Sequence, residues 1–355
     1  MGSERTRNLR AVAARTPRAV GTALAGLALA VGLSASPAAA ATEGNWINEG
    51  GSARSPEALS AVWYGGQVFE VTRGEDNRIW SRYGGGAWQP VPGNAHTRHR
   101  PEVVSFAGDS PTRRLIAFHV GDDGFVYYNV VQDLNANRWS GWTRIDSALR
   151  TYGEIRVIRG PGQILLSTVV NNRVYDQEIR GSLGQLHFTG WMPQQEPRVW
   201  SLDSTNNFTF TTGEQEFYAA RGLTNRVYLA RTSPRNRANA HYTELPGGGE
   251  CESVAIGRGG DPAHLATSAF DPGYAAQQNM AIGCISPNDH QLYLNRSSDG
   301  GNNWSGWAHS SGGPSPSGAA PEIHGFPGGE VFAVLSWGSE TAPFKRHMIV
   351  MKRVM

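Results

Sequence analysis

The chain has 355 residues, including 44 Gly, 20 Pro and 11 Trp, with 32 basic and 30 acidic side chains. Few long helical periods occur, so this composition predicts one large all-β domain built from many short strands and turns. Without residues 1–40 the chain keeps 27 basic and 29 acidic residues, and this slightly acidic balance excludes a general binder of nucleic-acid phosphates.

Residues 1–40 have the order of a secretory signal peptide. Five Arg residues come first, an apolar run from Ala19 to Leu33 follows, and small residues end the segment at Ala40. This order predicts cleavage after Ala40 or Ala41. The apolar run is short and Gly-rich for a membrane span, and no second candidate follows. We therefore expect a secreted, extracellular protein with no membrane span and a single domain over residues 41–355.

A degraded motif recurs along the remaining chain. Each copy has an aromatic or apolar residue in a strand that follows a polar turn. These inner markers are Trp80, Tyr127, Tyr175, Tyr228, Tyr293 and Ile349, with spacings of 47, 48, 53, 65 and 56 residues. A period of this length is typical of β-propellers. Six copies predict a six-bladed β-propeller.

A second aromatic marker predicts how the propeller closes. Its copies are Trp46, Trp88, Trp142, Trp191, Tyr242 and Trp307. Trp46 precedes every inner marker, and the last copy lacks an aromatic of its own. We expect residues 44–50 to pair beside the C-terminal strand His347–Arg353, because closure removes exposed sheet edges. Two stacked sandwiches, the alternative architecture, leave the position of Trp46 unexplained.

The first two copies are regular enough to place their strands. The expected strands are Glu57–Trp63, Gln67–Thr72, Arg78–Tyr83, Trp88–Val91, Glu102–Phe106, Leu115–Val120, Phe125–Val131 and Trp142–Ile145. The turns Gly74–Asn77 and Gly121–Gly124 carry residues that accept a positive φ. The longest insertion, Gly259–Gln278, falls in the fifth copy.

Two cysteines, Cys251 and Cys284, are present in this exported chain. Thiols outside the cell are normally oxidised, so we expect a disulfide. The alternative is that the two cysteines bind a metal, but no His lies near them at the spacing of metal ligands. His96, His99 and His119 also lack the spacing and the companion ligands of a metal site. We expect no cofactor and no metal.

Residues Ser297 to Trp304 match the Asp-box pattern Ser-x-Asp-x-Gly-x-x-Trp. Here Asp299 would cap a turn, Gly301 would permit the backbone conformation, and Trp304 would plug between sheets. The box therefore indicates a turn-stabilising element. It does not indicate a catalytic site.

One position at the start of each predicted innermost strand is polar. Its occupants are Glu57, Glu102, Glu154, Arg198, Glu252 and Glu322. The residues two positions further on, on the same strand face, are Leu59, Val104, Arg156, Trp200, Val254 and His324. Because innermost strands line a propeller's axis, these residues predict a ring of five carboxylates and one guanidinium at the channel mouth.

The predicted ring has two interpretations. Clustered carboxylates raise one another's pKa, which is typical of a functional site. Alternatively, each Glu bonds an Arg or the backbone of the neighbouring blade, and is repeated because the blade is repeated. Among the ring residues, Glu102 and Glu322 are candidate ligand-binding groups, and Glu322 is the first we would mutate.

The aromatic residues are the other candidate ligand-binding groups. An exposed aromatic face stacks on the apolar face of a sugar ring, and neighbouring polar groups bond its hydroxyls. The candidates are Trp88, Trp142, Trp191, Trp200 and Trp307. The alternative is that these rings wedge between adjacent blades and serve the fold.

Two copies carry a family resemblance. Val126-Tyr127 with Trp139-Ser-Gly-Trp142, and Leu292-Tyr293 with Trp304-Ser-Gly-Trp307, resemble the tectonin-like β-propeller lectins, and most closely the PLL-like fucose-binding group. The resemblance covers most of residues 44–355. It implies a propeller that binds fucosylated or methylated glycans in pockets between blades. Those lectins have seven blades, and the third and fourth copies here lack the paired Trp.

A weaker resemblance links the blade count and the Asp box to six-bladed sialidase-like glycosidases. Only Arg156 and Arg198 could correspond to their Arg cluster.

The sequence thus leaves three classes of function open. The first is a secreted carbohydrate-binding propeller. The second is a glycoside hydrolase or polysaccharide lyase with ring Glu residues as acid and base, Arg156 or Arg198 holding a substrate anion, and His324 nearby. Hydrolysis would require two carboxylates about 5–5.5 Å or 6.5–9.5 Å apart. The third is a propeller for protein interaction, because fold does not determine function.

Overall fold

The described part of the chain is all-β, as the composition predicts. The computed structural model describes residues 47–48, 55–106, 114–145, 148–160, 163–182, 185–209, 213–259, 278–310, 320–325, 331–339 and 346–353. Within these ranges the helical content is one short 3-10 helix, η1 (Arg237–Asn239). The predicted signal peptide, Trp46 and residues 260–277 of the insertion lie outside the described residues.

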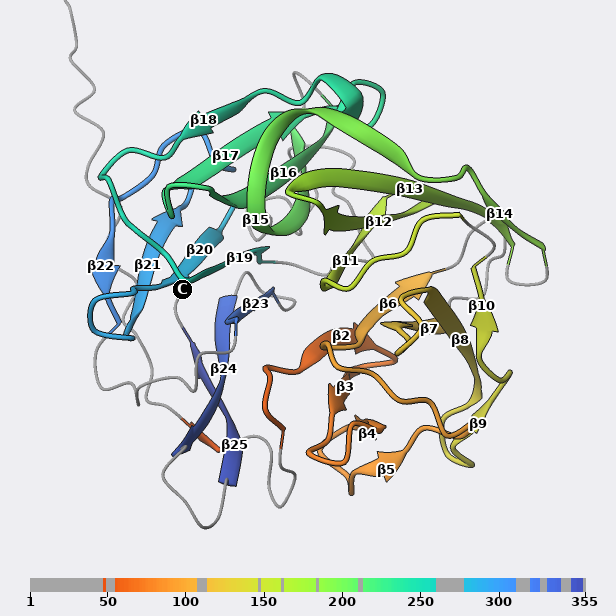
Figure 1. The fold of residues 1–355 in the computed structure, drawn as a ribbon. Coiled ribbons are helices and arrows are strands. Elements are labelled where there is room, and N and C mark those ends of the chain that lie inside the picture. Colours follow the sequence, from red (N-terminus) through yellow and green to blue (C-terminus); the bar gives the residue numbers. More distant parts are fainter. Residues whose placement is uncertain are drawn as a thin grey trace, which may run out of the picture. The chain divides into compact units, whose positions relative to one another are not determined.

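The described strands form five antiparallel sheets (Figure 1). The first contains β2 (Ser60–Tyr64), β3 (Gln67–Arg73), β4 (Ile79–Tyr83) and β5 (Gln89–Pro90). The second contains β6 (Glu102–Phe106), β7 (Arg114–Val120), β8 (Val126–Asp133), β9 (Arg138–Trp139) and β10 (Thr143–Arg144). The strands predicted for the first two copies agree with these within three residues at each end.

The third sheet has eight strands and joins the third and fourth copies. Its strands are β11 (Ile155–Gly160), β12 (Gln163–Val170), β13 (Arg173–Ser182), β14 (Gln185–Phe188), β15 (Met192–Thr209), β16 (Gly213–Gly222), β17 (Val227–Thr232) and β18 (Tyr242–Glu244). The two copies share one sheet because β15 is 18 residues long and pairs with both β13 and β16.

The last two sheets complete the described strands. One contains β19 (Ser253–Arg258), β20 (Met280–Ile285), β21 (Leu292–Ser297) and β22 (Ala308–His309). The other contains β23 (Glu322–Gly325), β24 (Val331–Ser339), β25 (Arg346–Arg353) and β1 (Ile47–Asn48). β1 pairs antiparallel with β25, with Ile47 opposite Met351, which is the pairing predicted for residues 44–50.

Positive-φ residues make the turns between the second and third strands. Asn77 has φ 60°, Gly124 79° and Asn225 63°, the conformations expected from their residue types. Each such turn presents a backbone carbonyl to the next copy. The Asn77 carbonyl, for example, accepts from the Thr97 N–H at 3.0 Å, so the turn and the next copy are tied together.

The first strands of the six copies contact one another in sequence. β2 contacts β6, β6 contacts β11, and the contacts continue through β15 and β19 to β23. β23 also contacts β2. Figure 1 shows these strands on the inner side of their sheets.

The hydrophobic core is divided between neighbouring sheets. One cluster joins the first two sheets through residues such as Val71 and Leu115, and another joins the second and third through Phe118 and Ile155. Each sheet therefore buries both faces against its neighbours, which is how repeats that cannot bury a face alone gain stability.

The predicted disulfide is present. It joins Cys251, just before β19, to Cys284 in β20, with 5.5 Å between the Cα atoms. Among the residues whose structure is described, none belongs to a helix with the length and apolarity needed to span a membrane.

Candidate functional site

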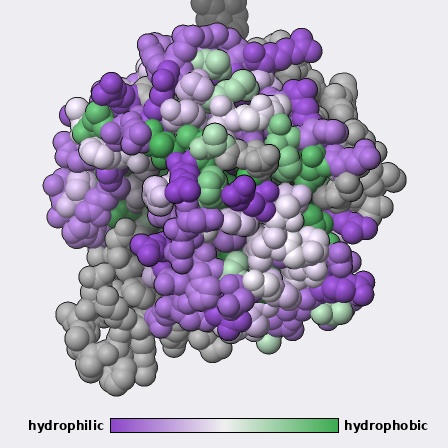
Figure 2. All heavy atoms as spheres, turned by 45° about the vertical axis from the view of Figure 1, so that its right-hand side comes forward, coloured by the Kyte–Doolittle hydropathy of each residue, from purple (hydrophilic) through white to green (hydrophobic). Residues whose placement is uncertain are grey.

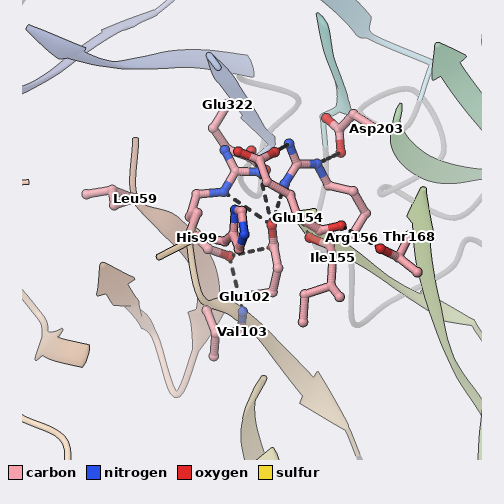
Figure 3. Close-up of polar contacts among 12 residues, drawn as sticks. Leu59, His99, Glu102, Val103, Glu154, Ile155, Arg156, Thr168, Asp203 and Glu322 are labelled. Carbon is pink, nitrogen blue, oxygen red and sulfur yellow. Dashed lines mark hydrogen bonds and ion pairs between the residues drawn. The ribbon is translucent and has the colours of Figure 1, made fainter. Parts of the chain in front are cut away.

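A buried ionic network connects the inner strands β6, β11, β15 and β23 (Figure 3). Its members are Arg100, Glu102, Glu154, Arg156, Asp203 and Glu322. Five of these side chains are buried, and that of Glu154 is 29% exposed.

Arg156 bridges three carboxylates. Its Nη1 lies 3.2 Å from Oε1 of Glu102, and its Nε lies 3.1 Å from Oδ1 of Asp203. Its Nη2 forms an ion pair with Glu154. One guanidinium therefore links β6, β11 and β15.

Arg100 connects the same network to β23. Its Nη2 lies 3.0 Å from Oε1 of Glu102 and also pairs with Glu322. Since the side chain of Arg100 is 1% exposed, its charge would be costly to bury without these partners.

Neutral donors satisfy further oxygens of the network. The Ser60 hydroxyl donates to Oε2 of Glu102 at 3.0 Å, and the Ile256 N–H donates to Oδ2 of Asp203 at 2.7 Å. These carboxylates thus bond Arg side chains and neighbouring backbone, which is the structural interpretation of the ring.

The charge balance of the network is reflected in its pKa values. Two guanidinium groups face four carboxylates, so full ionisation would leave excess negative charge. Burial raises the pKa of Asp203 to about 6 and raises the pKa of Glu322 well above its ordinary value. Burial opposes ionisation of Glu154 as well, but Arg156 and Arg100 lower the pKa of Glu154 to about 2. Burial therefore favours the protonated forms of Asp203 and Glu322, whereas the two guanidinium groups keep Glu154 ionised.

The strand registers correct the predicted ring. Equivalent residues of the first strands can be found by following the cross-strand pairs of each sheet. The count starts one residue after the inner marker on the third strand and crosses the second strand to the first. In the last sheet it starts at Met351, which pairs with Ile47 of β1. The equivalent residues are Ser60, Glu102, Arg156, Asp203, Ala255 and Glu322. The prediction that five carboxylates and one guanidinium share one position is therefore wrong. Of the six predicted residues, only Glu102 and Glu322 occupy the shared position. The segments that lead into the first strands differ in length, so aligning the copies on their first polar residue shifted the other four copies.

The remaining predicted ring residues lie in separate places. Oε1 of Glu57 lies 2.8 Å from Nη2 of Arg73, and Oε2 of Glu252 lies 3.0 Å from Nδ1 of His290. Arg198 is exposed. These three residues are not part of the buried network.

The positions two residues further on also differ from the prediction. Only Arg156 belongs to the network, whereas Leu59, Val104 and Val254 are buried apolar residues. The His324 Nε2 lies 3.1 Å from the carbonyl oxygen of Leu59. Trp200 is 52% exposed.

A small cavity adjoins the network. All six first strands line it, and its walls include Glu102, Arg159, Arg258, Glu322 and His324. Its volume of about 110 Å³ is below the range of about 300–1,000 Å³ that is usual for ligand pockets.

Glu57 and Glu154 are the least buried carboxylates of the predicted ring near the network. Burial, followed by the charge of Glu154, raises the pKa of Glu57 to about 7. The two side chains are 15% and 29% exposed. Carboxyl groups with separated pKa values are typical of acid and base pairs.

A second polar site is a pocket of about 390 Å³ between the first two sheets. We call it the His119 pocket. Its lining includes His96, His119, Asp122, Asp123, Tyr127 and Trp142. In Figure 2, which brings the side of the protein carrying β8 to β10 forward, hydrophilic residues cover most of the surface and apolar residues form small groups.

His119 is buried within an aromatic group. Its ring stacks on Tyr127, with centroids 5.3 Å apart, and meets Trp142 edge-on at 4.4 Å. The backbone of Val120 interacts with the imidazole, but neither ring nitrogen has a hydrogen bond of good geometry with a described residue. Burial lowers the pKa of His119 to about 4, so the imidazole is neutral at pH 7. A buried polar group without a partner is uncommon in proteins and requires an explanation.

The equivalent positions in other copies are satisfied. In each of the first five copies, one residue of the second strand lies opposite the inner marker. In chain order these residues are Thr72, His119, Thr168, Ala220 and Cys284. Thr72 bonds Ser55 at 2.9 Å, Thr168 bonds Thr151 at 2.8 Å, and Cys284 forms the disulfide. Ala220 is apolar and packs in a hydrophobic cluster. In the three bonded copies the bond joins the segment that precedes the first strand to the second strand of the same copy. At the equivalent position in the second copy, His119 lines a cavity without such a bond.

The predicted aromatic positions divide between the fold and the pocket. Trp88, Trp191 and Trp307 are half-buried and pack against hydrophobic clusters, and Arg82 lies over the Trp88 ring. Trp142 also packs against a cluster but lines the His119 pocket as well. Tyr242 is buried.

The Asp box makes the turn that its pattern predicts. Oδ1 of Asp299 accepts from the backbone N–H of Asn302 and of Asn303, at 3.0 and 2.9 Å. Gly301 has φ 81°, and Trp304 packs against a hydrophobic cluster. This element is structural.

Sequence reasoning missed three functional candidates. Asp203 and Arg100 belong to the network but fall outside the predicted ring positions, so the pairing of the strands was needed to find them. His119 was set aside for lack of metal spacing. Its signal was a polar aromatic residue where other copies carry Thr, Ala or Cys.

No family model matches the sequence, and no curated protein does. Solved structures, however, share the fold. An α-L-arabinofuranosidase from Fusarium graminearum matches at a TM-score of 0.58 and 13% identity, covering 88% of this chain and 98% of its own.

Two lectins also match. The Aleuria aurantia lectin, solved with Fucα1-6GlcNAc, has a TM-score of 0.51 at 11% identity, covering 82% of this chain and 90% of its own. A Burkholderia pseudomallei lectin has a TM-score of 0.54 at 16% identity, covering 85% and 83%. These likenesses show a β-propeller fold that resembles fucose-binding propeller lectins.

Proposed function

We propose that the chain is a carbohydrate-binding β-propeller and that the His119 pocket is its sugar site. One observation carries the proposal: a buried, neutral imidazole, to which no described residue offers a hydrogen bond of good geometry, lines a cavity beside Tyr127 and Trp142. A sugar could place its apolar face on an aromatic ring and a hydroxyl against the imidazole. The unsatisfied polar group would then gain the partner that the protein does not supply.

The proposal includes the architecture. We infer six blades, with the third and fourth joined in the eight-stranded sheet, closed by β1 on β25. The sequential contacts of the six first strands, the contact of β23 with β2 and the β1–β25 pairing support this arrangement.

Fucosylated and methylated glycans are the first ligands to test. The lectins with a similar fold include one solved with a fucosylated GlcNAc and one solved with α-methyl fucoside. The signal-like order of residues 1–40 supports secretion, and the disulfide is typical of exported proteins. The ligand would therefore be an extracellular glycan.

Glycoside hydrolysis is a second candidate function, favoured by the separated pKa values of Glu57 and Glu154. The fold likeness to an arabinofuranosidase is compatible with it. Against hydrolysis, Glu102, Asp203 and Glu322 are engaged by Arg side chains or by the backbone. Such contacts are expected of carboxylates that stabilise the fold. Turnover of aryl glycosides that is lost in both Glu57→Gln and Glu154→Gln would support hydrolysis over binding alone.

A glycan array followed by calorimetry tests the binding proposal. The array includes neutral, fucosylated and methylated glycans, and the variants are His119→Thr and, as a matched control, His187→Thr at an exposed position of β14. We expect wild type and control to bind alike and His119→Thr to bind at least about tenfold more weakly. A flat array response for the wild type, or unchanged affinity in His119→Thr, would contradict the proposal.

A further inference from the structure

A row of three side chains crosses the second sheet at the His119 pocket. His119 on β7 lies opposite Tyr127 on β8, and Tyr127 lies opposite Arg144 on β10. Opposite residues on antiparallel strands share a face of the sheet, as do residues two apart on one strand. Arg144 therefore lies on the same face as Tyr127 and Trp142, and the row runs from a buried imidazole to an exposed guanidinium.

A second guanidinium accompanies Arg144. The Cζ atoms of Arg144 and Arg150 lie 4.7 and 4.8 Å from the centroid of the Phe125 ring. Both Arg side chains are exposed. One aromatic ring thus holds two positive charges. Because both distances are measured to the same centroid, the two Cζ atoms are no further apart than the sum of the two distances.

The nearby carboxylates are engaged elsewhere. Asp122 pairs with Arg98 at 3.2 Å. Asp123 accepts from the Tyr127 hydroxyl at 2.8 Å and from the Phe125 N–H at 3.1 Å. Within the described ranges, neither Arg144 nor Arg150 forms an ion pair with a carboxylate. The charge of Arg144 contributes to lowering the pKa of Asp123, so Asp123 partly offsets this guanidinium from a distance. Two guanidinium groups near one such carboxylate leave net positive charge, which a bound anion would neutralise.

We propose that the sugar bound in the His119 pocket carries an anionic substituent, a carboxylate or a sulfate, and that Arg144 and Arg150 bind it. This inference rests on the proposed carbohydrate-binding function. Guanidinium groups match carboxylate and sulfate oxygens with paired N–H donors. Arg144 lies beside Tyr127 in the same cross-strand row, so one ligand can contact the aromatic group and reach the guanidinium.

Matched sugars separate the charge from the sugar ring. The probes are the methyl glycosides of glucose and galactose, their 6-sulfates and the corresponding uronates, titrated into the full-length protein by calorimetry. The variants are Arg144→Gln, Arg150→Gln and the double Arg→Lys variant, which keeps both charges. The control is Arg138→Gln, which removes an exposed guanidinium (65% exposed) on β9 of the same sheet.

We expect at least one anionic sugar to bind tenfold or more tightly than its neutral counterpart. That preference should be lost in both Gln variants, be largely kept in the Lys variant and the Arg138 control, and weaken as salt is added. Whether sulfate or uronate binds more tightly identifies the source of the anion.

Other outcomes separate this inference from the function on which it rests. If neutral and anionic sugars bind equally and binding depends on His119, the anionic inference is wrong and the sugar site stands. If anionic sugars bind equally well to His119→Thr, the Arg pair attracts anions independently of the pocket, and the inference is also wrong. If no sugar binds, both proposals fail.

Discussion

The buried ionic network and the His119 pocket both hold polar side chains away from water, but they satisfy them differently. In the network, Arg156 alone contacts Glu102, Glu154 and Asp203. In the pocket, neither His119 ring nitrogen has a hydrogen bond of good geometry with a described residue. A satisfied network stabilises a fold, whereas an unsatisfied group beside a cavity is suited to a ligand. The difference supports the proposal that the network serves the fold and that the His119 pocket binds the ligand.

The largest expected effect is on the network. Arg156→Met should lower the free energy of unfolding by about 3–5 kcal/mol, because it leaves buried carboxylates without their cation. Urea unfolding measures this change. Arg138→Met, at a 65% exposed position, should change stability by about 0.5 kcal/mol or less. Equal effects of the two substitutions would show that the network does not hold the inner strands together.

The disulfide should have the next largest effect. The Cys251→Ser, Cys284→Ser double variant should lose about 3–4 kcal/mol of stability on the chain-entropy account. Its sugar affinity should stay within about twofold of wild type, because the bridge lies near β19 and β20 and not in the His119 pocket. Thermal unfolding and calorimetry report the two quantities separately. A large loss of affinity in the folded variant would link the two regions and weaken the comparison.

His119→Thr should behave in the opposite way to a network substitution. The new hydroxyl can bond Thr97, as Thr72 bonds Ser55 and Thr168 bonds Thr151 in other copies. Stability should rise by about 0.5–1 kcal/mol, because an unsatisfied buried group is replaced by a bonded one. Chemical denaturation measures the change. Destabilisation by more than about 1 kcal/mol would indicate that His119 serves the fold.

A further prediction concerns pH. Burial raises the pKa of Asp203 to about 6 in the folded protein, above its ordinary unfolded value of about 3.9. The folded state therefore binds this proton more tightly, and its contribution to stability falls as pH rises from about 4 to 7. Asp203→Asn lacks this dependence, so its stability deficit relative to wild type should be smaller at pH 8 than at pH 5. Unfolding at the two pH values tests this, and a deficit that grows with pH would contradict the raised pKa.

The sequence predicted the elements better than the site. Strand boundaries in the first two copies followed from alternating apolar residues and from turns such as Gly121–Gly124, because both signals are local. The Asp-box turn was predicted for the same reason, whereas the Cys251–Cys284 bridge was predicted because the exported chain contains two thiols.

The site depended on register, which the sequence does not show directly. A ring aligned on the first polar residue of each predicted innermost strand included Glu57 and Glu252, although cross-strand pairing places Ser60 and Ala255 at the equivalent positions. Shifting a strand by one residue exchanges its two faces, so an error of two to five positions in the entering segment is enough to misplace a charge. His119 could be recognised only when its cross-strand partner was known to be Tyr127.

The most direct test of the central claim is the imidazole ¹⁵N spectrum of His119 during titration with the tightest-binding sugar of the array. The assignment of the signal comes from its absence in His119→Thr. We predict that the His119 ring nitrogens shift in proportion to sugar bound, because a hydroxyl supplies the missing hydrogen bond, while the signals of His99 and His324 near the ionic network stay in place. Saturation of binding with the His119 signal unmoved would contradict the assignment of the sugar site to this pocket.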